Sequence, residues 1–200
     1  DALLIVTEKL KSPTLKTQME ECFPFTKNDK KIILITAHRR ENHGDGIKNI
    51  GLAILELAQK YTKFEFVLPL HLNPNVRRPL LEMLSGIENV HLIEPQEYLP
   101  FVYLMSCSHI ILSDSGGVQE EALSLGKPVL VMRDTTERPE AVAAGTVKLV
   151  GSDTDTIVKE FSLLMDNPYL YEKMSMAKNP YGDGMASHRI VETLLKNNLL

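Results

Sequence analysis

The stretch ILSDSGGVQEEALSLGKPVLV, residues 111–131, shows the pattern that decides the fold. One apolar run opens it and a second, rich in valine, closes it, as expected of two buried strands. Between them Val118, Ala122 and Leu125 recur at helical spacing, and Gly126 ends that segment. The stretch therefore predicts a strand, a crossover helix and a second strand parallel to the first.

The same alternation extends along the chain in both directions. Apolar runs predict strands at residues 32–36, 64–68, 90–93, 109–112 and 129–132, with 146–150 as a candidate sixth. Helical spacing predicts helices at residues 45–61, with Asp45 as the cap, 73–86, 98–106, 118–125, 153–165, 168–178 and 186–195, and one or two within 1–22. Strands followed by helices imply an α/β fold with a doubly wound, Rossmann-like parallel sheet.

Composition limits the function classes. With 44% hydrophobic and 24% charged residues, the chain has the composition of a globular protein. A net charge of −4 argues against nucleic acid as the main partner. No apolar run approaches the ~18 residues of a membrane span, and no signal-peptide pattern opens the chain. The two cysteines, without metal-ligand spacing, indicate a reducing, cytoplasmic location.

The organisation predicted is a single domain over residues 1–200, because no repeat, low-complexity tract or linker interrupts the pattern. The chain begins at Asp1 rather than at a methionine, and we expect it to be a piece of a longer protein.

Ligands of doubly wound sheets bind beyond the carboxyl ends of the strands. Five loops follow predicted strands at that edge, at residues 37–44, 69–73, 94–97, 113–117 and 133–138. Candidate functional residues are therefore sought in these loops and at the start of the helices that follow them.

The loop at 113–117 contains Ser115, Gly116 and Gly117 directly before a helix. Unpaired N–H groups at a helix N-terminus attract anions, and glycines allow a phosphate to approach the backbone. The alternative is a plain turn in which Ser115 caps the helix. Glu121 flanks the apolar helix face, where its carboxylate could accept both hydroxyls of a ribose, or could simply favour the helix dipole. Glu120 is expected to be a solvated surface charge.

The loop at 37–44 is dense in charge. His38, Arg39 and Arg40 follow a predicted buried strand, with Glu41 beside them. Arginines pair with phosphate or carboxylate groups, and a histidine can move a proton. The alternative is a surface loop whose arginines and glutamates pair with one another. His71, after the next strand, is a weaker candidate.

Two further loops supply recognition groups. Gln96 and Phe101 could bind a base through an amide edge and a ring, or could be a helix cap and a core residue. Arg133 and Arg138 could reach a phosphate, or belong to a capped helix start. No pair or trio of His, Cys or Asp in these loops has metal-ligand spacing.

Six blocks, in this order and spacing, resemble one family: TAHRREN, HLNPNVR, EPQEYLPFVYLM, SDSGGVQEEA, GKPVLVMRDTTERPEA and AGTVKLVG. This family is the non-hydrolysing UDP-N-acetylglucosamine 2-epimerase, and the resemblance extends from about residue 1 to 195. Its members adopt the GT-B arrangement of two Rossmann-like domains, of which this chain would be the second. Residues 1–22 would then be inter-domain helices, and the helix at 186–195 would pack on the missing first domain.

The resemblance also implies site residues and ligands. It implies a catalytic His38 in the active site, and a UDP and substrate site formed by Gln96, Phe101, Ser115, Gly116, Gly117, Glu121 and Arg138. Gln96 and Phe101 would hold the uracil, Ser115 to Gly117 the diphosphate, and Glu121 the ribose. Arg39 and His71 match positions that bind a second, regulatory UDP-N-acetylglucosamine in bacterial members.

The activity that the resemblance implies is interconversion of UDP-N-acetylglucosamine and UDP-N-acetylmannosamine by elimination and re-addition of UDP. It implies no metal or other cofactor, no membrane partner, and a homodimer for the full-length enzyme. Because the family's acid and base carboxylates lie in the first domain, this chain alone is expected to be inactive. The alternatives are the donor-binding domain of a GT-B UDP-sugar glycosyltransferase, or a non-catalytic domain that binds nucleotide sugars.

Overall fold

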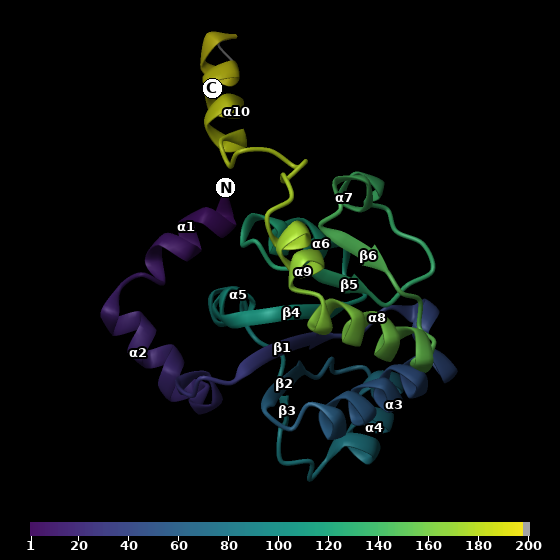
Figure 1. The fold of residues 1–200 in the computed structure, drawn as a ribbon. Coiled ribbons are helices and arrows are strands. Elements are labelled where there is room, and N and C mark those ends of the chain that lie inside the picture. Colours follow the sequence, from purple (N-terminus) through teal and green to yellow (C-terminus); the bar gives the residue numbers. More distant parts are fainter. Residues whose placement is uncertain (198–200) are drawn as a thin grey trace.

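The computed structural model describes residues 1–197 and is drawn in Figure 1. Its six strands form one parallel sheet in the order β3-β2-β1-β4-β5-β6. The strands are β1 (Lys31–Thr36), β2 (Phe64–Pro69), β3 (Val90–Ile93), β4 (Ser108–Ser113), β5 (Val129–Val131) and β6 (Val147–Leu149). The order reverses between β1 and β4, which is the topological switch point of a doubly wound sheet. The predicted fold class and all six predicted strands are confirmed.

The described part of the chain also contains ten α-helices and two short 3₁₀ helices. The α-helices are α1 (Ala2–Lys9), α2 (Pro13–Cys22), α3 (Asp45–Lys60), α4 (Pro74–Leu84), α5 (Tyr98–Cys107), α6 (Gly116–Ser124), α7 (Pro139–Ala144), α8 (Thr154–Asp166), α9 (Pro168–Ser175) and α10 (Ala186–Lys196). The 3₁₀ helices are η1 (Pro24–Lys27) and η2 (Arg40–Asn42).

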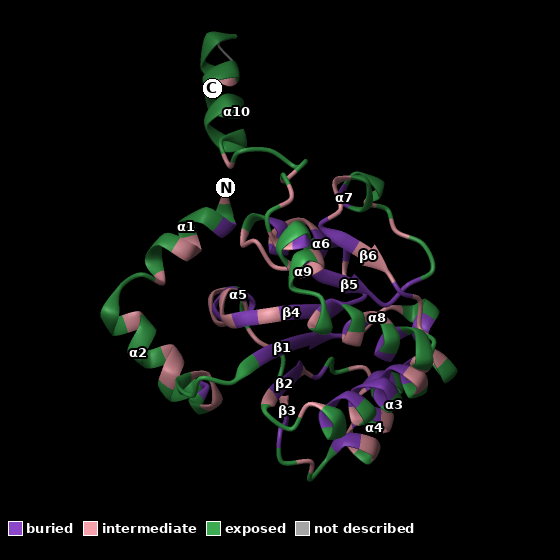
Figure 2. Cartoon of the chain, in the orientation of Figure 1, coloured by how far each residue is buried: buried purple, intermediate pink, exposed green. Residues whose placement is uncertain are grey.

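Two apolar layers cover the two faces of the sheet. Successive residues of a strand point to opposite faces, so Ile33 and Ile35 of β1 contribute to one layer and Ile32 and Leu34 to the other. The first layer contains α3, α4, α8 and α9, and the second contains α1, α5, α6 and α7. Figure 2 shows the strands largely buried between these helices. This double coverage explains why the strand sequences are continuous apolar runs.

Short side-chain caps define several helix starts. Asn73 accepts a hydrogen bond from the Asn75 N–H at 2.9 Å, and Asp153 accepts one from the Thr156 N–H at 2.9 Å. The prediction that Asp45 caps α3 was wrong by one residue. Asp45 is the first helical residue, and Gly44 precedes it with φ of 82°, a conformation that a glycine adopts without steric cost.

Helix α10 differs from the rest of the fold. It projects from the sheet domain in Figure 1, and none of its residues is buried. Ile190 and Leu195 are each 58% exposed. The side chain of Asp1 accepts hydrogen bonds from the N–H groups of Ala186 and Ser187 and so caps α10 from the other end of the chain. Packing of residues 186–195 on another domain stays a prediction.

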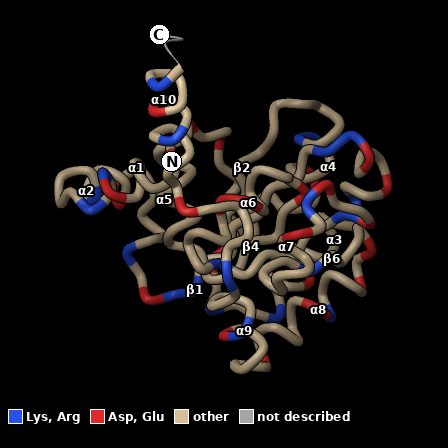
Figure 3. The backbone as a smooth tube through the Cα atoms, turned by 90° about the horizontal axis from the view of Figure 1, so that it is seen from above, with Lys and Arg blue, Asp and Glu red and all other residues tan. Residues whose placement is uncertain are grey.

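Figure 3 shows basic and acidic residues interspersed along the tube of the described chain. Within residues 1–197, no helix combines the length and the apolar character needed to span a bilayer.

Candidate functional site

A crevice of about 270 Å³ lies at the switch point of the sheet. Loops that follow β1, β2, β3 and β4 contribute its walls, together with the start of α5 and α6. Five of the predicted site residues meet there, namely His38, His71, Gln96, Phe101 and Ser115, beside Thr36, Ala37, Pro69, Pro95 and Val118. The carboxyl ends of neighbouring parallel strands share one edge, which is why residues so far apart in sequence converge.

Asp114 is the residue that anchors this crevice, and the sequence analysis did not select it. Its side chain is fully buried directly after β4. Oδ2 accepts hydrogen bonds from the backbone N–H groups of His38 and Arg39, both at 2.8 Å, and from Asn42 Nδ2 at 3.2 Å. These contacts fix the loop after β1 to the end of β4. An acid between a predicted buried strand and a glycine turn was the available signal.

His38 lies against the other oxygen of the same carboxylate. Its Nδ1 is 3.2 Å from Asp114 Oδ1, and its ring stacks on His71 with centroids 5.7 Å apart and planes 24° apart. Burial lowers the pKa of His38, the negative charge of Asp114 opposes that shift, and His71 and Arg39 add to it. His38 is therefore predominantly neutral near pH 7 in the absence of a ligand.

The loop before α6 brings Ser115 to the crevice, whereas Gly116 and Gly117 are not among the residues that line it. Ser115 is the N-cap residue, yet its side chain makes no capping hydrogen bond. Its backbone N–H is bound by Ser113 Oγ at 3.0 Å. A Cβ at position 116 would lie 3.4 Å from an Arg39 guanidinium nitrogen, an ordinary contact distance, so Arg39 lies beside the helix start. The structure thus shows no serine cap, and anion binding at this helix start stays a prediction.

Gln96 and Phe101 lie on the opposite wall. Gln96 Nε2 donates a hydrogen bond to the Glu94 carbonyl at 2.6 Å, which orients the amide at the crevice. Phe101 is half-buried and packs against the core on one side while it lines the crevice on the other. Phe101 therefore packs in the core, as one alternative expected, and also lines the crevice. Its contact with a base stays a prediction.

Glu121 lies in a neighbouring hollow of about 510 Å³ rather than in the crevice itself. Tyr98 donates a hydrogen bond to Glu121 Oε1 at 3.0 Å. Burial raises the pKa of Glu121, and the Tyr98 hydrogen bond opposes that shift. Burial and the bond to Glu121 together raise the pKa of Tyr98 to about 12.

The expectation that Glu120 is a solvated surface charge was wrong. Glu120 is partly buried, lines the same hollow as Glu121, and forms an ion pair with Arg138. Helix α6 starts two residues earlier than predicted. Helix α7 begins at Pro139 and is followed by Gly145 with φ of 78°. Arg138 is the N-cap residue of α7. Arg138 is thereby held away from the crevice by a carboxylate.

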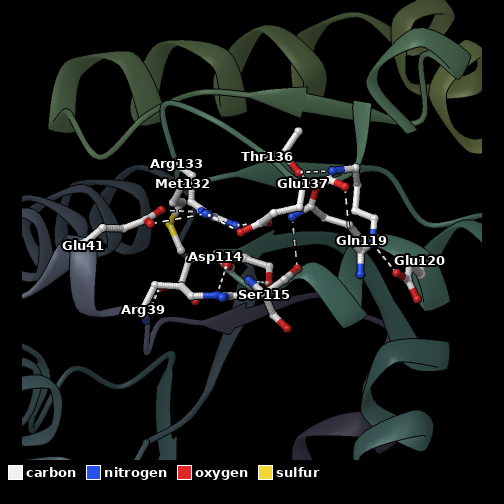
Figure 4. Close-up of polar contacts among 12 residues, drawn as sticks. Arg39, Glu41, Asp114, Ser115, Gln119, Glu120, Met132, Arg133, Thr136 and Glu137 are labelled. Atoms are coloured by element: carbon white, nitrogen blue, oxygen red, sulfur yellow. Dashed lines mark hydrogen bonds and ion pairs between the residues drawn. The ribbon is translucent and has the colours of Figure 1, made fainter. Parts of the chain in front are cut away.

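A buried arginine connects two of the predicted loops (Figure 4). Arg133 follows β5, is 4% exposed, and donates hydrogen bonds to Glu41 and Glu137. These bonds raise the pKa of Arg133 and, through its guanidinium, lower the pKa of Glu137 to about 2. Arg133 therefore joins the loop after β1 to the loop after β5, and its donors are used within the protein. No group of three or more His, Cys, Asp or Glu side chains in residues 1–197 is arranged to hold a metal ion.

The fold and the crevice together define a doubly wound α/β domain with a crevice at its switch point, bordered by the start of α6 and two histidines. A family model described as UDP-N-acetylglucosamine 2-epimerase matches residues 1–195, and the chain belongs to that family. This confirms the resemblance seen in the sequence.

Relatives and solved structures agree with the family. A UDP-N-acetylglucosamine 2-epimerase of Neisseria meningitidis is 72% identical over 98% of this chain and 53% of its own length. The Escherichia coli K12 enzyme is 53% identical over the whole chain and 53% of its own length. The crystal structure of a Neisseria meningitidis UDP-GlcNAc 2-epimerase bound to UDP-GlcNAc superposes with a TM-score of 0.95, at 71% identity, over 98% of this chain and 53% of that one.

A UDP co-structure of MnaA from S. aureus superposes with a TM-score of 0.83, at 44% identity, over 91% of this chain and 49% of that one. The chain thus spans about half the length of the relatives that it matches.

Proposed function

We propose that this chain is the UDP-binding half of a non-hydrolysing UDP-N-acetylglucosamine 2-epimerase, the second domain of a GT-B enzyme. The observation that carries the proposal is the crevice at the switch point, where a helix N-terminus, an amide, an aromatic ring and two histidines face one space. Family membership and the relatives bound to UDP-GlcNAc and UDP support the choice of ligand. The alternative of a glycosyltransferase half has no such support, because the likeness to the polymerase TagF, at 15% identity, concerns the fold alone.

In this proposal UDP extends from the crevice into the neighbouring hollow that Glu120 and Glu121 line. Gln96 and Phe101 bind the uracil, and the Ser115 hydroxyl together with the backbone N–H groups of Gly116 and Gly117 binds the diphosphate. Glu121 accepts the ribose hydroxyls, for which Oε2 is the oxygen that Tyr98 does not occupy. Arg138 reaches the nucleotide only if it leaves Glu120.

Arg39 and His71 are proposed to contact a second, regulatory UDP-N-acetylglucosamine. Arg39 also lies beside Gly116, so a regulatory ligand that contacts Arg39 would lie next to the diphosphate.

The proposed reaction proceeds by elimination and re-addition. A base removes the C2 proton of the sugar, the C1–O bond breaks with its electron pair on UDP, and a glycal forms. UDP then adds back at C1 while a proton is delivered to the opposite face of C2. This chain would bind UDP and stabilise its departure through the helix N-terminus and a protonated His38. The acid and base carboxylates would come from the other half of the protein, without a cofactor, in a cytoplasmic homodimer.

Calorimetry with UDP, UMP and uridine tests the binding proposal. UDP should bind more tightly than UMP, and UMP more tightly than uridine, because each phosphate adds charge at the N-terminus of α6. Equal affinity for uridine and UDP would contradict the phosphate role of residues 115–117.

Replacement of Glu121 by Ala tests the ribose assignment. UDP affinity should fall about tenfold or more, since a lost hydrogen bond to a charged group costs about 1.5–3 kcal/mol. Affinity for 2′,3′-dideoxy-UDP should change much less. Glu140→Ala, an exposed carboxylate in α7, is the matched control. Equal losses for both nucleotides would show that Glu121 acts on something other than the diol.

A deuterium-exchange assay tests the division of labour. The chain alone should incorporate no solvent deuterium at C2 of UDP-N-acetylglucosamine, followed by NMR, because one histidine contributes only about 10²–10⁴-fold to proton transfer. Deuterium at C2 would place the proton-transfer groups within this chain.

A further inference from the structure

The two oxygens of the Asp114 carboxylate have different surroundings. Oδ2 accepts three hydrogen bonds, from the N–H groups of His38 and Arg39 and from Asn42 Nδ2. Oδ1 is buried and accepts none. The basic atom that faces it is His38 Nδ1 at 3.2 Å, but the pair does not have the geometry of a hydrogen bond. One oxygen thus holds the loop, and the other is directed at an imidazole.

A buried carboxylate oxygen without a donor is costly, by about 1–3 kcal/mol or more for a charged group. A rotation of the His38 ring that brings Nδ1–H into line with Oδ1 would remove that cost. Because the tautomer of a histidine follows the hydrogen bond that one nitrogen makes, the other nitrogen then carries a lone pair. The His38 side chain is 35% exposed at the crevice, and with Nδ1 against the buried carboxylate the exposed edge is the one that carries Nε2.

We propose that Asp114 is a positioning residue for His38. Its Oδ1 accepts a hydrogen bond from His38 Nδ1–H, which fixes the neutral tautomer and leaves Nε2 as the nitrogen that exchanges a proton at the crevice. The groups that face this imidazole are Asp114, His71 and Arg39. Of these only Asp114 stabilises a positive ring, so a proton taken up at Nε2 is supported from the buried side.

The consequence for catalysis rests on the proposed function. When a diphosphate lies at the N-terminus of α6, its negative charge raises the pKa of His38 and Nε2 gains a proton. The imidazolium then donates a hydrogen bond from Nε2 to a phosphate oxygen and one from Nδ1 to Asp114. The tautomer itself does not depend on UDP and can be measured on the free chain.

The experiment is long-range ¹H–¹⁵N correlation NMR on chain labelled with ¹⁵N-histidine, with His38→Gln used to identify the His38 signals. At mildly alkaline pH the His38 Nδ1 should be protonated and Nε2 should be bare. On acidification Nε2 should be the nitrogen that gains a proton. A wild-type chain with Nε2–H and a bare Nδ1 would overturn the proposal, and this outcome needs no variant that might fail to fold.

Asp114→Asn separates positioning from loop anchoring. The amide oxygen must face the N–H groups of His38 and Arg39, so the NH₂ group takes the place of Oδ1 and donates to Nδ1. We expect His38 to switch to the Nε2–H tautomer and its pKa to fall, while the remaining amide spectrum is retained. Asp134→Asn, an exposed acid after the adjacent strand, is the control and should change neither property.

An unchanged tautomer and pKa in Asp114→Asn would show that Asp114 serves the loop alone. UDP calorimetry on the same samples is a separate readout. A chain that shows the predicted tautomer but binds no UDP would contradict the proposed function and leave the positioning role in place.

Discussion

The crevice between β1 and β4 and the helix α10 differ in how they are held. In the crevice one buried carboxylate accepts from three donors on the neighbouring loop, and apolar layers lie on both sides of the strands. Helix α10 buries none of its residues, and Asp1 caps its start. The difference indicates that the loops around the crevice contribute more to stability than α10, whose apolar positions add little to the domain by themselves.

Of the substitutions considered, Asp114→Ala is expected to lower the free energy of unfolding the most. It leaves the backbone N–H groups of His38 and Arg39 without their acceptor, and the Asn42 amide keeps only its hydrogen bond to the Met132 carbonyl. We expect the free energy of unfolding to fall by about 3–5 kcal/mol, as the sum of unsatisfied donors at about 1–3 kcal/mol each suggests. Urea unfolding measures it. Asp134→Ala, the control at an exposed acid, should stay within about 0.5 kcal/mol of wild type. Similar losses for the two variants would show that the buried Asp114 carboxylate stabilises the fold no more than an exposed one does.

Arg133→Met should have a smaller effect at neutral pH, below about 2 kcal/mol, because Glu41 and Glu137 are exposed enough to regain water. The effect that distinguishes Arg133→Met is a changed pH dependence of the free energy of unfolding. The pKa of Glu137 is depressed from 4.5 to about 2 by Arg133. A depressed carboxyl pKa contributes stability that is complete above 4.5 and lost as the pH falls through about 2.

Urea unfolding between those pH values should therefore show a shallower loss of stability on acidification for Arg133→Met than for wild type. Glu137→Gln should reproduce the shallower slope. Parallel curves for all three proteins would mean that the pair contributes nothing to acid sensitivity, and that this part of the site is held as loosely as α10.

The smallest effect is expected at α10. Ile190→Ser should change the free energy of unfolding by no more than about 0.5 kcal/mol, because Ile190 is 58% exposed. Ile54→Ala in α3, where Ile54 is 1% exposed, is the contrasting variant and should cost about 2–5 kcal/mol. A large loss for Ile190→Ser would show that α10 is packed in solution, against another copy of the chain or elsewhere on the same one.

The sequence by itself determined the sheet and its helices. Strands covered on both faces are continuous apolar runs, and helices repeat their apolar residues at helical spacing, so both can be recognised locally. It also located the five loops at the functional edge, since the carboxyl ends of the strands are known once the strands are. The blocks HRREN, SDSGG and TERPEA pointed to the family, and the family model confirms it.

Only the tertiary structure decided which charges meet. Asp114 reads as one polar residue in a turn, and its hydrogen bonds reach back more than seventy residues to the loop after β1. The sequence indicates a solvated surface charge at Glu120, but in the structure Glu120 forms an ion pair with Arg138. Ion pairs and buried hydrogen bonds depend on distances across the fold, which local periodicity does not encode. The strand order that brings β1 beside β4 is what places His38 against the carboxylate of Asp114.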